Sequence, residues 1–118
     1  DSTSELALAR QSYELAAKSA VLFSDFSKAA KQAEKLIQIS FNEEDTHSAV
    51  LFCTDIYTEA KDYSKAEATL TPYLYEKSDF GLTCLFTLAQ IYEKSGSYLK
   101  ADNIYNQIQE LVFFFLLS

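Results

Sequence analysis

The sequence predicts an all-α fold built from helical hairpins, and three observations support this prediction. A short turn pattern occurs three times, as Asp25-Phe26-Ser27-Lys28-Ala29, Asp62-Tyr63-Ser64-Lys65-Ala66 and Ser97-Tyr98-Leu99-Lys100-Ala101. Apolar residues recur at three- and four-residue steps on both sides of each copy, which is typical of amphipathic helices. Only two Gly and one Pro interrupt the 118 residues, so the composition favours helices over strands. A helix-turn-helix pattern that returns about every 35 residues indicates stacked hairpin repeats.

The first hairpin is predicted over residues 4–40. The apolar stripe of its first helix consists of Leu6, Ala9, Tyr13, Ala16, Ala17 and Ala20. We expect its second helix to begin after an N-cap at Ser27. The buried stripe of this second helix consists of Ala29, Ala30, Ala33, Leu36 and Ile37. Both stripes have helical spacing, so the two segments form one hairpin.

The second hairpin is predicted over residues 46–77, after an acidic loop that ends with Asp45 or Thr46 as the N-cap. The apolar positions of its first helix are Val50, Leu51, Cys53, Ile56 and Tyr57. Those of the returning helix are Ala66, Leu70, Tyr73 and Leu74. Pro72 lies inside this returning helix and removes a backbone donor, so we expect a kink there rather than the end of the helix.

The third hairpin is predicted over residues 79–117. Ser78 or Asp79 is expected to cap its first helix. The apolar stripe of that helix consists of Leu82, Leu85, Phe86, Leu88, Ala89 and Tyr92. Gly96 then ends it in the left-handed conformation that helix ends favour. The last helix runs from about Tyr98 towards the C-terminus.

Aligned on these turns, the chain resembles the tetratricopeptide repeat family over roughly residues 10 to 115. The third copy carries the family's large and small positions in order, as Leu85, Leu88, Ala89, Tyr92, Gly96, Tyr98, Ala101 and Tyr105. The second copy keeps Tyr57, Tyr63 and Ala66 but has Thr54 at the small site and Lys61 at the turn glycine. In the first copy Ala20 replaces the aromatic residue, as in a divergent cap. The resemblance implies a single domain, residues 1–118, in which the hairpins stack in a right-handed superhelix.

Charge and hydropathy exclude two classes of partner. Ten basic and seventeen acidic side chains give a net charge of -7, which repels polyanions, so no nucleic-acid partner is expected. The longest apolar run, at the C-terminal end, is far shorter than the ~20 residues of a spanning helix, so this segment is not expected to insert directly into a membrane. The turns and lead-in resemble those of membrane-tethered proteins facing the bacterial periplasm, which favours that compartment over the alternative, the cytoplasm.

No group of residues predicts an enzyme, a metal site or a cofactor. His47 is the sole histidine and lies among carboxylates in a polar loop, where a solvated neighbour of a helix cap is the simpler reading than a metal or acid-base site. Cys53 and Cys84 lie on apolar helix faces, where burial as small hydrophobic residues is the default and a disulfide the alternative. The sequence also contains no Gly-rich phosphate loop and no convincing catalytic triad.

In the tetratricopeptide family the first helices of the hairpins line a concave groove, and the resemblance carries this role to particular residues. The partner-binding residues it implies are Leu51, Asp55, Thr58, Glu59, Phe86, Gln90, Glu93 and Lys94, with Ser48 and Thr83 beside them and Glu14, Lys18 and Val21 as an extension. The Lys, Arg and Asn residues of the chaperone-binding carboxylate clamp are replaced here, which excludes that subgroup. With Leu51 and Phe86 as anchors among acidic residues, the groove suits a segment with apolar and basic side chains; the alternative is that both anchors pack inside the stack.

Function is therefore predicted as a scaffold that binds a protein or peptide partner, in an assembly at a bacterial membrane. The alternative is a structural module that assembles with itself, and a cytosolic enzyme regulator is a third hypothesis. The self-association residues predicted for this alternative are Leu111, Val112, Phe113, Phe114, Phe115 and Leu116, which together with Leu117 present apolar groups around the whole helix. We expect a homodimer through this segment, unless it folds back on its own repeats or a further helix covers it.

Overall fold

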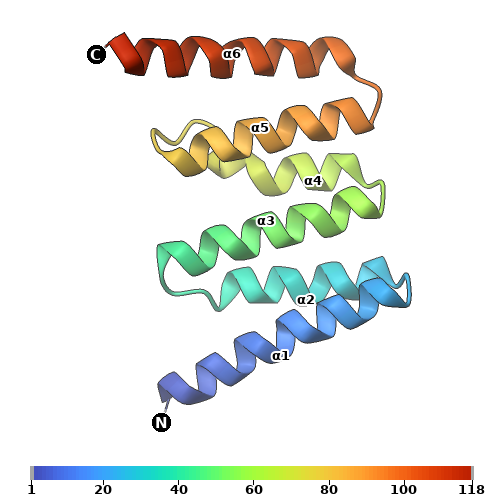
Figure 1. The fold of residues 1–118 in the computed structure, drawn as a ribbon. Coiled ribbons are helices and arrows are strands. Elements are labelled where there is room, and N and C mark those ends of the chain that lie inside the picture. Colours follow the sequence, from blue (N-terminus) through green and yellow to red (C-terminus); the bar gives the residue numbers. More distant parts are fainter. Residues whose placement is uncertain (1, 118) are drawn as a thin grey trace. The chain divides into compact units, whose positions relative to one another are not determined.

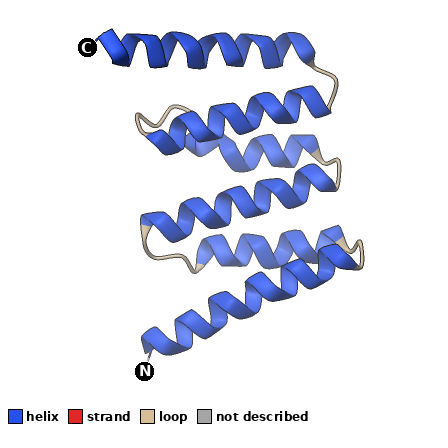
Figure 2. Cartoon of the chain, viewed as in Figure 1, coloured by secondary structure: helices blue, strands red, loops and turns tan. Residues whose placement is uncertain are grey.

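A computed structural model describes residues 2–117 of the chain, and every regular element in this range is helical (Figures 1 and 2). The predicted all-α class is thus confirmed. The chain divides into two compact units, Asp1–Asp62 and Tyr63–Ser118, called here the first and second unit. The second predicted hairpin contributes its first helix to the first unit and its second helix to the second unit.

The first unit contains three helices: α1 (Ser2–Leu22), α2 (Phe26–Gln38) and α3 (Glu43–Glu59). In Figure 1 α2 runs back along α1, and it packs against both α1 and α3. The buried positions of α1 and α2 are almost all alanine, namely Ala17, Ala20, Ala29, Ala30 and Ala33. Side chains this small let the two helix backbones approach closely, so the contact between α1 and α2 depends on close packing of the helices rather than on large apolar side chains.

The second unit contains α4 (Tyr63–Leu70), the 3-10 helix η1 (Thr71–Tyr73), α5 (Asp79–Lys94) and α6 (Tyr98–Leu117). α5 is the central element, because it packs against both α4 and α6 (Figure 1). The buried side chains of α5 are Phe80, Cys84, Leu85, Leu88, Ala89 and Ile91. In contrast, α6 buries a single residue, Ala101.

The three repeated turns share one backbone geometry. Ser24, Lys61 and Gly96 have φ angles of 60°, 60° and 85°, in the left-handed region that normally favours glycine. In each turn the next residue donates its N–H five residues back, at 2.9, 2.9 and 2.7 Å, while the left-handed residue donates three residues back. This is the Schellman motif of helix ends. The left-handed conformation predicted for Gly96 is confirmed, and the sequence repeat corresponds to a structural one.

Two of the predicted N-caps are wrong by two to four residues. Asp25, not Ser27, caps α2 and accepts a hydrogen bond from the Lys28 N–H. Asn42, rather than Asp45 or Thr46, caps α3 and accepts from the Asp45 N–H at 2.8 Å. The acidic stretch that indicated a loop instead forms the first turn of α3, where carboxylates favour the positive end of the helix. The third prediction holds, because Ser78 caps α5.

Pro72 ends the regular helix, so the predicted kink is wrong. α4 stops at Leu70, and Pro72 lies in the 3-10 turn η1. Proline has no N–H to donate four residues back, and its ring crowds the preceding helical turn. The loop that follows closes tightly on α5, because a Cβ added at Gly81 would lie 2.0 Å from the Glu76 carbonyl oxygen. Glycine is required here for close approach rather than for an unusual φ angle.

Candidate functional site

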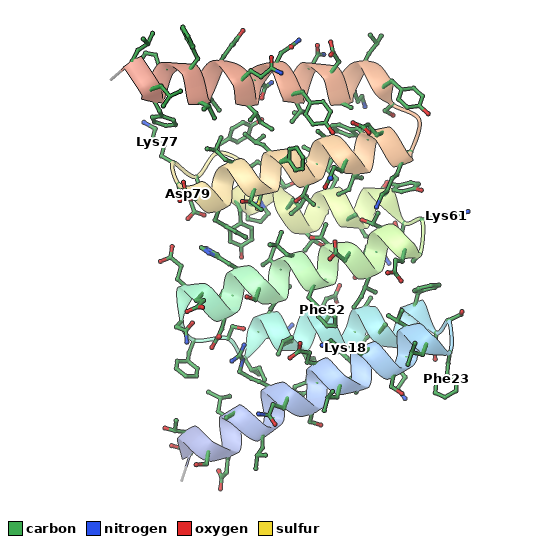
Figure 3. The ribbon with its side chains drawn as sticks, viewed as in Figure 1. Lys18, Phe23, Phe52, Lys61, Lys77 and Asp79 are labelled. Carbon is green, nitrogen blue, oxygen red and sulfur yellow. The ribbon has the colours of Figure 1, made fainter. Side chains whose placement is uncertain are left out.

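A hollow of about 350 Å³ lies between α1 and α3 in the first unit. Its lining residues are Lys18, Val21, Leu22, Phe52, Asp55, Ile56 and Glu59. Four of these, Lys18, Val21, Asp55 and Glu59, are residues that the family resemblance assigns to the groove. Figure 3 shows Lys18 of α1 close to Phe52 of α3. The structure therefore brings together predicted site residues from two successive hairpins, and adds Phe52, Leu22 and Ile56.

The α1–α3 hollow combines an apolar floor with a charged rim. Ile56 is buried, whereas Asp55 and Glu59 are exposed. Lys18, the single basic residue of the lining, forms an ion pair with Glu14 at 3.1 Å. Such a surface can receive an apolar side chain and hold a neighbouring cation.

The other two residues predicted on α3 contribute less to this surface. Leu51 is half-buried. The Thr58 hydroxyl donates to the Thr54 carbonyl oxygen at 2.8 Å, so it satisfies its hydrogen bond within the helix. Neither residue lines the α1–α3 hollow.

The four residues predicted on α5 all lie exposed, yet two of them contact α6. The ring of Phe86, which is 47% exposed, meets Tyr105 edge-on with the centroids 5.9 Å apart. The Tyr105 hydroxyl in turn donates to Glu93. Gln90 and Lys94 are exposed on the same helix. Phe86 is thus partly engaged in packing, as the alternative interpretation of this anchor expects.

The predicted self-association residues are all exposed. Leu111, Val112, Phe113, Phe114, Phe115, Leu116 and Leu117 have exposed fractions between 39% and 79%. Beside them α5, α6 and the loop before α5 enclose an apolar hollow of about 520 Å³, called here the α5–α6 hollow. Leu111, Phe114 and Phe115 line it from α6, and Leu82 and Leu85 line it from α5.

Two tyrosine–glutamate hydrogen bonds join successive helices, and the sequence analysis missed both. Tyr57 of α3 donates to Glu34 of α2, and Tyr92 of α5 donates to Glu67 of α4 at 2.7 Å. Burial, together with the adjacent carboxylate, raises the pKa of Tyr92 to about 12 and that of Tyr57 further above its usual range. These tyrosines stay neutral donors at physiological pH.

An ion pair also fixes α1 against the start of α3. The Arg10 Nη1 lies 2.7 Å from the Asp45 Oδ2, and Asn42 donates to the same oxygen at 2.8 Å. Both charged side chains are partly shielded from solvent, which strengthens the pair relative to a fully exposed one. This contact and the α1–α3 hollow lie at successive points along the two helices, so α1 and α3 run in the same direction here.

The residues weighed for chemistry in the sequence analysis are His47, Cys53 and Cys84. The His47 Nε2 is 3.8 Å from the Glu43 Oε1, one helical turn away. Cys53 and Cys84 are not joined by a disulfide, and both are fully buried, as the default interpretation predicted. Burial raises the pKa of the Cys84 thiol to about 11, which disfavours the nucleophilic thiolate.

None of the helices formed by residues 2–117 combines the length and the apolar character needed to cross a bilayer. Comparisons of the chain with protein-family models, with curated proteins and with solved structures give no match.

Proposed function

We propose that this chain is a non-enzymatic interaction module, built from tetratricopeptide-like hairpins, that binds a segment of a protein partner in the α1–α3 hollow. The observation that carries the proposal is that this hollow lies between the first helices of two successive hairpins. In the tetratricopeptide family those helices line the binding groove. The shared left-handed turn at Ser24, Lys61 and Gly96 supports the same repeat architecture.

The chemistry of the hollow specifies the kind of segment. Val21, Phe52 and Ile56 offer contact to an apolar side chain, and Asp55 and Glu59 offer two carboxylates to a Lys or Arg nearby. The net charge of -7 adds long-range attraction for a basic segment. The partner is therefore a short extended or helical segment that alternates apolar and basic side chains.

Selection from a random peptide library displayed on phage tests this proposal, because it does not require the natural partner to be identified. We expect enriched peptides to combine Lys or Arg with aromatic or aliphatic residues. For a synthetic peptide of that kind, Asp55→Asn/Glu59→Gln weakens binding about two- to thirtyfold, because each of the two exposed charge pairs contributes about 0.2–1 kcal/mol. Fluorescence anisotropy measures this loss of affinity at low and at high salt. The loss should be smaller at high salt, because salt screens the charge pairs.

Asp102→Asn/Glu110→Gln is the matched control, since it removes the same two charges from exposed positions on α6 and leaves the α1–α3 hollow intact. Equal weakening by both double variants would mean that only net charge matters. Enriched peptides without basic residues would contradict the assigned chemistry.

The alternative function, a structural self-assembly module, has its own supporting observation. The seven apolar side chains of residues 111–117 are exposed on α6, whereas surface helices of globular proteins normally turn such residues towards a core. This surface belongs to the second unit and shares no residue with the lining of the α1–α3 hollow.

A further inference from the structure

Residues 111–117 form an apolar surface larger than a monomer of this size normally exposes. If a fully exposed Val, Leu or Phe presents about 170–240 Å², their exposed fractions amount to roughly 900 Å² of accessible surface. The largest apolar patch on a typical monomer is about 300–600 Å². A specific interface buries about 800 Å² on each partner. Because these side chains surround α6, one partner covers only part of this area. The residues that line the α5–α6 hollow or are named below as its projections, Leu111, Phe113, Phe114, Phe115 and Leu117, contribute roughly 700 Å², close to what one side of a stable dimer buries.

The C-terminal half of α6 carries projecting side chains and also contributes to a recess. Phe113 and Leu117 are one helical turn apart on α6, 64% and 73% exposed, and neither lines the α5–α6 hollow. The recess beside them is that hollow, with about 520 Å³ of space and apolar walls. In a two-fold contact each copy presents the same patch to the other, so the projecting side chains of one copy can meet the recess of its partner.

Charge favours a second copy over an anionic membrane as the occupant. Residues 111–117 carry no charged side chain, so pairing two of them brings no like charges into the centre of the contact. The chain as a whole carries -7, which opposes adsorption to an anionic lipid surface. Charged residues, namely Lys77 and Asp79 in Figure 3 and Glu110 on α6, lie near the edge of the apolar area, which is the usual arrangement of a polar rim around an apolar centre.

We infer that two copies of the chain pair through the C-terminal half of α6, with Phe113 and Leu117 of each copy seated in the α5–α6 hollow of the other. The contact buries the aromatic side chains of both helices. It extends the second candidate function and does not depend on peptide binding by the first unit.

Sedimentation velocity over a concentration series tests the inference. We expect the unmodified chain to sediment as a dimer, with an apparent mass twice that of the monomer, at micromolar concentration. Phe113→Glu/Leu117→Glu should weaken pairing about a hundredfold or more, because two central anchors are replaced by charges. Both side chains are largely exposed in the single chain, so circular dichroism and thermal unfolding should show an intact fold at concentrations where the variant is monomeric.

Leu99→Glu is the matched control. Leu99 is 83% exposed in the first turn of α6, outside the proposed contact, so this variant should remain dimeric. A monomer at high micromolar concentration would overturn the inference. A Phe113→Glu/Leu117→Glu variant that pairs as tightly as the unmodified chain would do the same, as would open-ended aggregates without a closed dimer.

Flotation with vesicles of phosphatidylcholine and phosphatidylglycerol shows whether lipid or a second copy of the chain occupies the apolar surface. An unmodified chain that floats with the vesicles as a monomer would assign the surface to lipid and overturn the inference. Peptide binding through Asp55 and Glu59 is measured on another surface, so loss of either result leaves the other interpretable.

Discussion

Replacement of Lys61 by glycine is expected to stabilise the protein, although it removes a side chain. Lys61 has a φ angle of 60° in the turn after α3, a conformation that costs an L-residue about 1–2 kcal/mol. Figure 3 shows its side chain pointing away from the turn, and it is exposed, so little packing is lost. Glycine gives back about 0.5–1 kcal/mol through the larger entropy of its unfolded chain. The net expectation is a gain of about 0.5–1 kcal/mol.

Thermal and urea unfolding at one fixed protein concentration measure this gain. An increase of this size raises the midpoint temperature by roughly 2–6 °C in a chain of this length. Lys61→Ala is the control, because it removes the same side chain but keeps the left-handed strain, and it should leave stability nearly unchanged.

Gly96→Ala provides the same test with the opposite sign. Gly96 has a φ angle of 85°, and an added Cβ would meet nothing within 4 Å, so its cost comes from the backbone alone. We expect a loss of about 0.5–1 kcal/mol. Two results together would refute the idea that these turns share one strained backbone geometry. Lys61→Gly would be no more stable than Lys61→Ala, and Gly96→Ala would be as stable as the unmodified chain.

Three further outcomes follow from buried groups. Gly81→Ala should lose about 3 kcal/mol or more in urea unfolding, far more than Gly96→Ala, because the new Cβ would collide with a backbone carbonyl that must move; a loss equal to that of Gly96→Ala would contradict this. The free energy of unfolding should fall as the pH rises from 10 to about 12, because the unfolded chain releases the Tyr92 proton near pH 10 whereas the folded chain keeps it until about pH 12. Unfolding titrations of Tyr92→Phe should show a smaller dependence of stability on pH in this range. An unchanged dependence would argue against a raised pKa of Tyr92 in the folded chain. Cys53 and Cys84, both fully buried, should react with a thiol reagent only after unfolding in concentrated guanidinium chloride, so rapid labelling of the native chain would show that at least one of them is accessible.

Local features of the fold could be predicted well where one residue type has one dominant role. Gly96 was expected to be left-handed because glycine bears no Cβ, and the structure agrees. Ser24 and Lys61 adopt the same conformation without that signal, and only their position in the repeated pattern indicates it. Pro72 shows the limit of such rules, since a proline inside a helix can either kink or end it, and packing of the following loop on Gly81 accompanies the second outcome.

The candidate site was less predictable because its contacts join residues far apart in the chain. Arg10 and Asp45 are 35 positions apart, and no periodicity links them. Tyr57 and Tyr92 occupy equivalent positions before their turns. Their acceptors Glu34 and Glu67, however, differ by about one helical turn when the turns are aligned, so comparison of the repeats does not reveal the pairs. The family resemblance, in contrast, brought four residues of the α1–α3 hollow together because it supplies spatial neighbours rather than sequence neighbours.

The two tyrosine–glutamate bonds have a consequence for the way the chain unfolds. The Tyr57–Glu34 bond lies within the first unit and the Tyr92–Glu67 bond within the second, so each bond holds together two helices of one compact unit. Within a compact unit, contacts between neighbouring helices make local unfolding cooperative. A helix that frays at one of these contacts therefore breaks the Tyr–Glu bond and removes stabilisation from the helix beside it. The phenol–carboxylate pairs thus help the bonded helices of each unit to open and close together.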